Sequence, residues 1–251
     1  MEHASIHDLK KSVLGRYKGS WFAVIKANII PIVAAVITGI LIMGATLTVT
    51  YMFGQISGND INQLMYGNST GPGGYSRPNV AMEFLFNAIT MFIAVGIQYG
   101  ILDWLRNAQQ APSWNTAFQT FTRKYFVSTL AIYIFQFIFE LLWSFLFLIP
   151  GLIKIYSYSQ AYFLYKDAEE RNLSGDYEFI NFITFSRRLM NGNKGRLFLL
   201  QLSLVGWYIL SVASFGIGFI WFVPYKNGLY AAFYKDLVEK NGSKVLPELF
   251  K

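Results

Sequence analysis

The chain has no cysteine and only two histidines, His3 and His7, both near its N-terminal end. The absence of cysteine excludes disulfides, thiolate nucleophiles and thiolate metal sites. Since both histidines precede every apolar segment, a buried His–carboxylate catalytic pair is not expected. The sequence also lacks a Gly-x-Ser-x-Gly elbow, a Walker loop, a His-Glu-x-x-His sequence and an acidic cluster with metal spacing. We therefore predict a non-enzymatic protein that uses no cofactor and no metal.

Charged residues are scarce as well. They make up 14% of the chain, whereas hydrophobic residues make up 54%, and soluble domains carry about 25% charged residues. Residues 27–59 contain no charge at all. A membrane-spanning helix needs about 20 mostly apolar residues, so this composition predicts an integral membrane protein.

The apolar runs predict an all-α fold, a polytopic membrane helical bundle that forms one integral membrane domain over residues 1–251. Six transmembrane helices are expected as three hairpins, with amphipathic helices at the membrane interface. The predicted spans are residues 29–53, 82–104, 125–149, 152–165, 197–215 and 219–237. Residues 54–79, rich in Gly, Asn and Ser, predict a polar outer loop without a core.

Orientation follows from the distribution of Lys and Arg. With six spans, 18 of the 21 basic residues fall on the side that holds both termini, and only Arg77 falls on the other side. Cytoplasmic loops carry an excess of Lys and Arg. The sequence therefore predicts a multi-pass protein of the cell membrane with both termini in the cytoplasm. The net charge of +7 is then a topology and lipid-headgroup signal, and no nucleic-acid partner is expected because no basic face is clustered.

Three cytoplasmic segments have apolar residues at helical spacing. The first is a predicted interfacial helix over residues 5–20, with Ser5 and Asp8 at its start. The others precede the spans that begin at residues 125 and 197. Each predicts a helix with its aromatic side toward lipid and its basic side among the headgroups, which either braces the bundle or docks lipid or a partner. The candidate headgroup contacts are Arg16, Lys18, Arg123, Lys124, Arg187, Arg188 and Arg196.

A short sequence repeats at the ends of two hairpins. Tyr165-Lys166-Asp167 closes one hairpin and Tyr234-Lys235-Asp236 closes another, which indicates that the chain is built from similar units. The acidic residues from Asp167 to Glu178 are expected on a solvated cytoplasmic face.

Three ionisable residues interrupt the apolar spans: Glu140, Lys154 and Lys226. A charge at mid-membrane costs at least about 2.5 kcal/mol, so such residues are candidates for a functional site. We predict that Glu140 pairs with Lys226 and that Lys154 reaches toward the outer surface or Glu83. The charges either fix helix register, line a pathway for a substrate or ion, or bind a lipid phosphate or peptide carboxylate.

The predicted span 152–165 is polar for a membrane helix. Tyr156, Tyr158 and Tyr162 are interleaved with serines and a glutamine. Their hydroxyls are expected to face the bundle interior, either as interhelical hydrogen bonds or as the lining of a cavity. Together with Glu140, Lys154 and Lys226, they form the candidate buried polar site.

Several segments resemble one known family. They are residues 6–11 with 19–21, the run Ile-Pro-Gly-Leu-Ile-Lys-Ile-Tyr-Ser-Tyr-Ser at 149–159, residues 185–192 with 206–208, and residues 223–225 with 231–234. Together they resemble the DUF975 family of bacterial integral membrane proteins. The resemblance implies a six-span protein, mostly of Gram-positive bacteria, and no established activity. It supplies no catalytic residues.

Two functions fit the sequence. The first is a non-enzymatic integral membrane protein that binds lipid, a hydrophobic peptide or a membrane protein subunit within the bilayer, in envelope homeostasis or peptide immunity. The alternative is a small transporter or permease component that uses the buried charges of Glu140, Lys154 and Lys226.

Overall fold

The structure, a computed structural model, describes residues 3–55, 80–109, 111–146 and 148–250. These residues form helices joined by turns, with no strand among them, as the all-α prediction expected. The elements are α1 (Ile6–Tyr17), α2 (Trp21–Ala27), α3 (Ile29–Gln55), α5 (Val80–Arg106), η1 (Trp114–Phe121), α6 (Phe126–Leu146), α7 (Leu148–Tyr158), α8 (Ala161–Glu170), η2 (Ser174–Asp176), α9 (Phe179–Leu189), α10 (Lys194–Ala213) and α11 (Phe219–Val245). Apart from residues 54 and 55, which end α3, the predicted outer loop lies outside the described residues.

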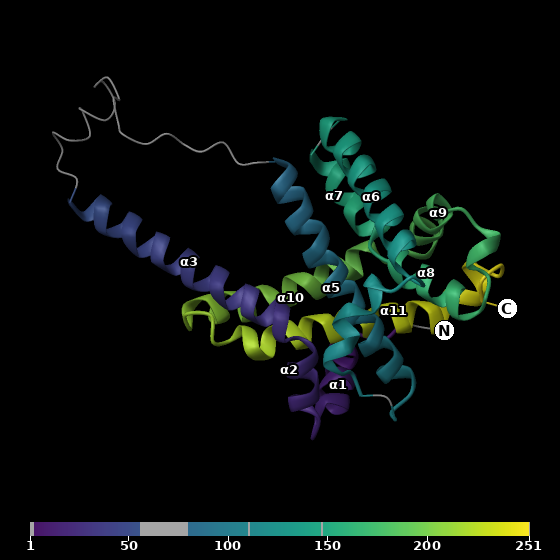
Figure 1. Cartoon of the computed structure of the whole chain (residues 1–251), viewed down its shortest axis with the longest axis horizontal. Coiled ribbons are helices and arrows are strands. Elements are labelled where there is room, and N and C mark those ends of the chain that lie inside the picture. Colours follow the sequence, from purple (N-terminus) through teal and green to yellow (C-terminus); the bar gives the residue numbers. More distant parts are fainter. Residues whose placement is uncertain (1–2, 56–79, 110, 147, 251) are drawn as a thin grey trace.

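Four helices in the described part of the chain are long and apolar enough to cross a membrane. They are Ile29–Tyr51, Phe84–Arg106, Phe126–Trp143 and Lys194–Ala213, and they indicate a membrane protein. In Figure 1, α3, α10 and the start of α11 extend to one side, whereas α6 and α7 extend upward together. The two groups meet where α5, α8 and the C-terminal half of α11 pack.

The predicted span 152–165 is wrong as a single helix, because the chain breaks between α7 and α8 at Ser159 and Gln160. The break is caused by a side chain of another helix, Ser186 of α9. The Ser186 hydroxyl donates to the Ser157 carbonyl at 2.7 Å and accepts the Gln160 N–H at 3.1 Å. A polar side chain inserted into the helical hydrogen-bond ladder interrupts it.

The predicted boundaries of the neighbouring spans also shift. The span expected to end at residue 149 ends at Leu146, and α7 already begins at Leu148. Pro150 therefore lies in the first turn of α7, where the missing N–H costs no intrahelical hydrogen bond. The span predicted over 219–237 lies within the longer helix α11, which continues to Val245. The turn before it holds Phe215 and Gly216 at positive φ.

The predicted N-terminal helix is present but faces protein. Ser5 and Asp8 form the expected capping box, and hydrogen bonds from the Ser5 hydroxyl and N–H lower the pKa of Asp8. Leu9, Val13 and Tyr17 pack toward α11, where the Tyr17 hydroxyl donates to the Pro224 carbonyl at 2.9 Å. Burial raises the pKa of Tyr17. Similarly, α9 buries its apolar face against α6, α8 and α11.

The segment η1 packs against α5 along its length. A Cβ added at Gly96 would lie 2.8 Å from the Ala117 carbonyl oxygen, and one at Gly100 would overlap the Thr116 side chain. The Thr120 hydroxyl donates to the Phe92 carbonyl at 2.8 Å. These two glycines therefore let η1 approach the α5 backbone. The opposite face of η1 exposes the rings of Trp114, Phe118 and Phe121, which lie tilted against one another.

A buried ionic cluster joins α5, α8 and α11. The carboxylate of Asp167, 2% exposed, accepts two bonds from the Arg106 guanidinium at 2.5 and 2.8 Å. It also accepts the Tyr234 hydroxyl at 2.6 Å. The neighbouring Lys166 amine, 1% exposed, donates to Asp103 at 2.5 Å and to Glu170. The expectation that this acidic run lies on a solvated face is therefore wrong for Asp167.

The second Tyr-Lys-Asp sequence makes a similar cluster. Asp236 accepts the Arg196 guanidinium at 2.6 Å and the Ala4 N–H at 3.0 Å. The Lys235 amine donates to the Leu105 carbonyl at the end of α5, at 2.9 Å. In both copies the aspartate thus binds an arginine of another helix and the lysine reaches the last turn of α5, so the sequence repeat is also a structural repeat.

We predict that Asp167→Asn lowers the free energy of unfolding by about 3 kcal/mol, because Arg106 would keep a poorly solvated charge without its partner. The matched control is Glu239→Gln, which removes a carboxylate that is 60% exposed and 3.7 Å from Lys235. This control is expected to change the free energy by less than about 0.5 kcal/mol. Denaturation of both variants in detergent, followed by tryptophan fluorescence, measures the difference. Equal stabilities would contradict the role given to Asp167.

Candidate functional site

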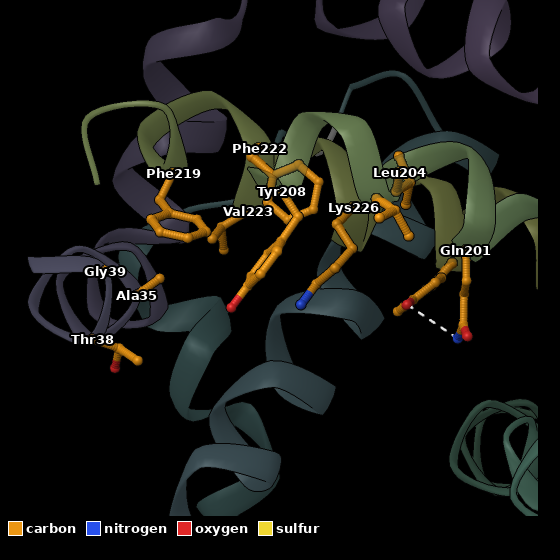
Figure 2. Close-up of a pocket in the computed structure, with 12 residues that line it drawn as sticks. Ala35, Thr38, Gly39, Gln201, Leu204, Tyr208, Phe219, Phe222, Val223 and Lys226 are labelled. Atoms are coloured by element: carbon orange, nitrogen blue, oxygen red, sulfur yellow. Dashed lines mark hydrogen bonds between the residues drawn. The ribbon is translucent and has the colours of Figure 1, made fainter. Parts of the chain in front are cut away.

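The candidate site is a cavity of about 400 Å³ between α3, α10 and α11, named here the Lys226 cavity. Its wall is largely apolar and aromatic, and Figure 2 shows the Tyr208, Phe219 and Phe222 rings on the side of the cavity opposite Gln201. Ligand pockets typically measure about 300–1,000 Å³ and combine apolar walls with a few polar groups. The exposed side chains of Val205 and Tyr208 lie at its edge, so the cavity opens to the surroundings.

Close packing of α3 on the α10–α11 turn forms one end of this cavity. A Cβ on Gly39 would lie 2.9 Å from the Phe219 ring, and one on Gly216 would lie 3.0 Å from the Val36 carbonyl oxygen. Gly216 also has a φ of 88°, which L side chains rarely adopt. The turn therefore seats Phe219 against α3 and sets the position of the first two turns of α11.

Lys226 supplies the cation of the cavity. It lies seven residues after Phe219, roughly 10 Å along α11, and Figure 2 shows its amine directed into the open space beside the Tyr208 hydroxyl. The side chain is half-buried. No hydrogen bond or ion pair within the described ranges uses this amine. A poorly solvated ammonium without a partner is unfavourable, so the cavity favours an anionic group beside Lys226.

A second cavity of about 230 Å³ adjoins the first and is named here the Tyr162 cavity. Gln201 and Tyr230 line both cavities. The Gln201 side chain accepts the Tyr156 hydroxyl at 2.8 Å and donates to the Tyr230 hydroxyl at 3.3 Å. At the far side, the Tyr162 hydroxyl and the side-chain amide oxygen of Gln160 are buried and lack a hydrogen-bond partner among the described residues. Polar groups thus line a continuous surface from Lys226 to Tyr162.

A row of amide side chains supports this surface. Gln98 of α5 donates to Asn227 at 3.3 Å, and Asn227 donates to Asn28 at 2.8 Å. Buried amides that are paired in this way fix the helices around them, since leaving one unpaired is costly. The residue next to Lys226 therefore ties α11 to α5 and to the start of α3.

The structure brings together only part of the predicted polar site. Lys226 lines the first cavity and Tyr162 lines the second. Tyr156 lines neither, but its hydroxyl donates to Gln201, which lines both. No ion pair within the described ranges joins the Glu140 carboxylate of α6 to Lys226. Tyr158 is buried against the Phe139 ring. Lys154 lies over the Trp143 ring at 4.2 Å and faces a different pocket.

The predicted headgroup residues differ in their surroundings. Lys18, Arg123, Lys124, Arg187 and Arg188 are exposed, although Arg188 also binds Glu248 at 2.5 Å. Arg16 lies over Trp104, and its guanidinium reaches the Leu105 carbonyl at 3.5 Å. The side chain of Arg196 is only 15% exposed, so it does not face the surface. Its guanidinium instead binds the Asp236 carboxylate and the Ala4 carbonyl.

Sequence reasoning missed Gln201, Tyr230 and Asn227. Two of these are amides inside apolar runs, and Gln98 is another. An uncharged polar residue in an apolar run is the signal that could have found them, because membrane helices place such groups toward protein partners or cavities.

Comparison with known proteins gives one match. A family model described as "Protein of unknown function (DUF975)" matches residues 151–241, which include α8, α9, α10 and both Tyr-Lys-Asp sequences. No curated protein and no solved structure matches the chain. The matched residues carry Gln201, Lys226 and Tyr230 of the cavities. The match supports membership of this chain in the DUF975 family, whose function is unknown.

Proposed function

We propose that this chain is a non-enzymatic integral membrane protein that binds an anionic amphiphile, either a lipid or a hydrophobic peptide with an acid group. The single observation behind the proposal is the Lys226 amine, which points into an apolar-walled cavity without a protein partner among the described residues. An acid group would accept a charge-assisted hydrogen bond from Lys226. The aliphatic part would lie against Leu204, Phe222 and Val223.

The membrane setting supports this ligand class. The helices that form the cavity expose large apolar side chains outward, for example Ile37, Leu202 and Ile209, so a lipid-like molecule could enter from the bilayer without crossing water. A water-soluble anion would gain little from the aromatic wall. An amphiphile that enters from the bilayer keeps its chain in apolar surroundings along the wall, and its acid group gains a charge-assisted hydrogen bond from Lys226. A role in envelope homeostasis or peptide immunity fits such binding.

Binding of a fluorescent fatty acid to the purified full chain tests the proposal. Lys226→Met removes the charge and keeps an apolar stem of similar length, so we predict at least tenfold weaker binding, on the order of 1.5 kcal/mol. Lys244→Met is the matched control, because Lys244 lies exposed near the end of the same helix, and its affinity should equal that of the wild type. Unchanged affinity of Lys226→Met would exclude this site.

The proposed topology has six membrane crossings and places both termini in the cytoplasm of a cell-membrane protein. Residues 152–165, which form most of α7 and the start of α8, and residues 219–237 of α11 complete the set. The distribution of Lys and Arg supports this orientation. The absence of cysteine permits single-cysteine mapping without background labelling. With a membrane-impermeant maleimide on intact cells, we predict that Ser69→Cys is labelled, whereas Lys18→Cys and Lys244→Cys react only after lysis. Labelling of Lys18→Cys on intact cells would reverse the orientation.

The alternative function is a small transporter or permease component. The observation that favours it is the shared lining of the two cavities, which runs from Lys226 past Gln201 toward Tyr162. Proteoliposomes with a fluorescent anionic phospholipid on both leaflets and an external quencher test it. Transport predicts faster leaflet exchange that both Glu140→Gln and Lys226→Met slow about tenfold. Binding without transport predicts no exchange above that of empty liposomes.

A further inference from the structure

A pocket of about 320 Å³ lies between α7, α9 and the start of α10 and shares no lining residue with the Lys226 cavity. It is named here the basic pocket. Four cations line it: Lys154, Arg187, Arg188 and Lys194. The neutral groups are Ser157, Thr184 and Asn191. No aspartate or glutamate is among the lining residues.

The local fold brings these cations together. Arg187 and Arg188 occupy the last turn of α9, and the chain then reverses through residues 190–193, where Gly192 has a φ of 78°. This turn places Lys194 at the start of α10, facing the same pocket as Lys154 of α7. Three helices thus contribute positive charge to one hollow, where Lys154 of α7 joins the cations on either side of the α9–α10 turn.

The charge of this pocket is mostly unneutralised. Arg188 binds Glu248 at 2.5 Å and the Val245 carbonyl at 2.7 Å. Lys154, Arg187 and Lys194 take part in no ion pair within the described ranges, and the charges of Arg187 and Lys194 repel that of Lys154. A cluster of like charges in a partly enclosed hollow is unfavourable by itself, and a bound anion removes the repulsion.

The donors suit a phosphate group in particular. Guanidinium groups match the oxygens of phosphate in a bidentate manner, and lysine amines add compact positive charge. The Thr184 hydroxyl and the Asn191 amide can donate to the remaining oxygens. A single carboxylate has only two oxygens and would leave part of this donor set unused.

The surface around the pocket is apolar. Ile153 and Ile155, the neighbours of Lys154 on α7, are exposed, and so are Phe198 and Leu199 one turn after Lys194 on α10. A phosphate held by the cations would therefore lie directly above apolar side chains that can contact acyl chains. We infer that the basic pocket binds the phosphate group of an anionic phospholipid, with Lys154, Arg187 and Lys194 as its main ligands.

Lipid-dependent thermal stability of the full chain tests this inference. The protein is placed in nanodiscs of phosphatidylcholine with and without phosphatidylglycerol, and its melting temperature is followed against the phosphatidylglycerol content. We expect phosphatidylglycerol to stabilise the wild type, and the double variant K154Q/R187Q to need at least tenfold more of it for the same shift. In phosphatidylcholine alone, the double variant should melt no lower than the wild type, because the substitutions relieve repulsion between the cations.

The matched control is K11Q/K244Q, which removes the same charge from two exposed positions, one on α1 and one near the end of α11. Its response to phosphatidylglycerol should equal that of the wild type. An equal loss in both double variants would overturn the site, since any surface charge would then suffice. An undiminished response of K154Q/R187Q would overturn it as well.

In a further experiment, inorganic phosphate or glycerol phosphate is added to the protein in nanodiscs of phosphatidylcholine alone, and the melting temperature is measured again. If they stabilise the wild type as strongly as phosphatidylglycerol does, the lipid assignment fails. The fatty acid measurement separates this inference from the proposed function. K154Q/R187Q is expected to keep fatty acid binding, and Lys226→Met is expected to keep the response to phosphatidylglycerol.

Discussion

The carboxylate of Asp167 is the constraint on which the remaining structure depends. It is buried, and it binds Arg106 of α5 and Tyr234 of α11 at the same time. A buried ion pair adds little net stability compared with apolar residues, but it is costly to break once formed. Its effect is therefore to specify one arrangement of α5, α8 and α11. The Asp236 cluster fixes α11 again, against Arg196 and the chain before α1.

This constraint also sets the candidate site. Lys226 lies eight residues before Tyr234 on α11, and Gln98 lies eight residues before Arg106 on α5, each roughly 12 Å along its helix. Asp167 binds both Arg106 of α5 and Tyr234 of α11. About two turns earlier on the same two helices, Gln98 donates a hydrogen bond to Asn227. Lys226, the residue before Asn227, lines the cavity that α3 and α10 complete. The ionic cluster and the cavity therefore share α11, and the cluster that fixes this helix also fixes the position of Lys226.

The helical class and the long apolar helices were predictable from the sequence, because runs without charge and the Ser5–Asp8 cap are local signals. The family match confirms the resemblance over residues 151–241. Tertiary contacts between distant segments could not be predicted. Ser186 breaks the helix predicted over 152–165, and α1 buries its apolar face against α11 instead of facing lipid. The cost of a charge in an apolar run pointed to Lys226, and the polar composition of the predicted span 152–165 pointed to Tyr162. Gln201 and Tyr230 required the helix packing to be known.

Photo-cross-linking from within the Lys226 cavity tests the central claim most directly. A benzoylphenylalanine at position 208, where Tyr208 lines the cavity, would react with whatever occupies it in cells, and a second at position 47, where Leu47 is exposed on α3, samples bulk lipid. Mass spectrometry of the two adducts gives the comparison. The account predicts an aliphatic molecule with an acid group, enriched at position 208 and lost in Lys226→Met. The same adducts at both positions, or adducts unaffected by Lys226→Met, would contradict it.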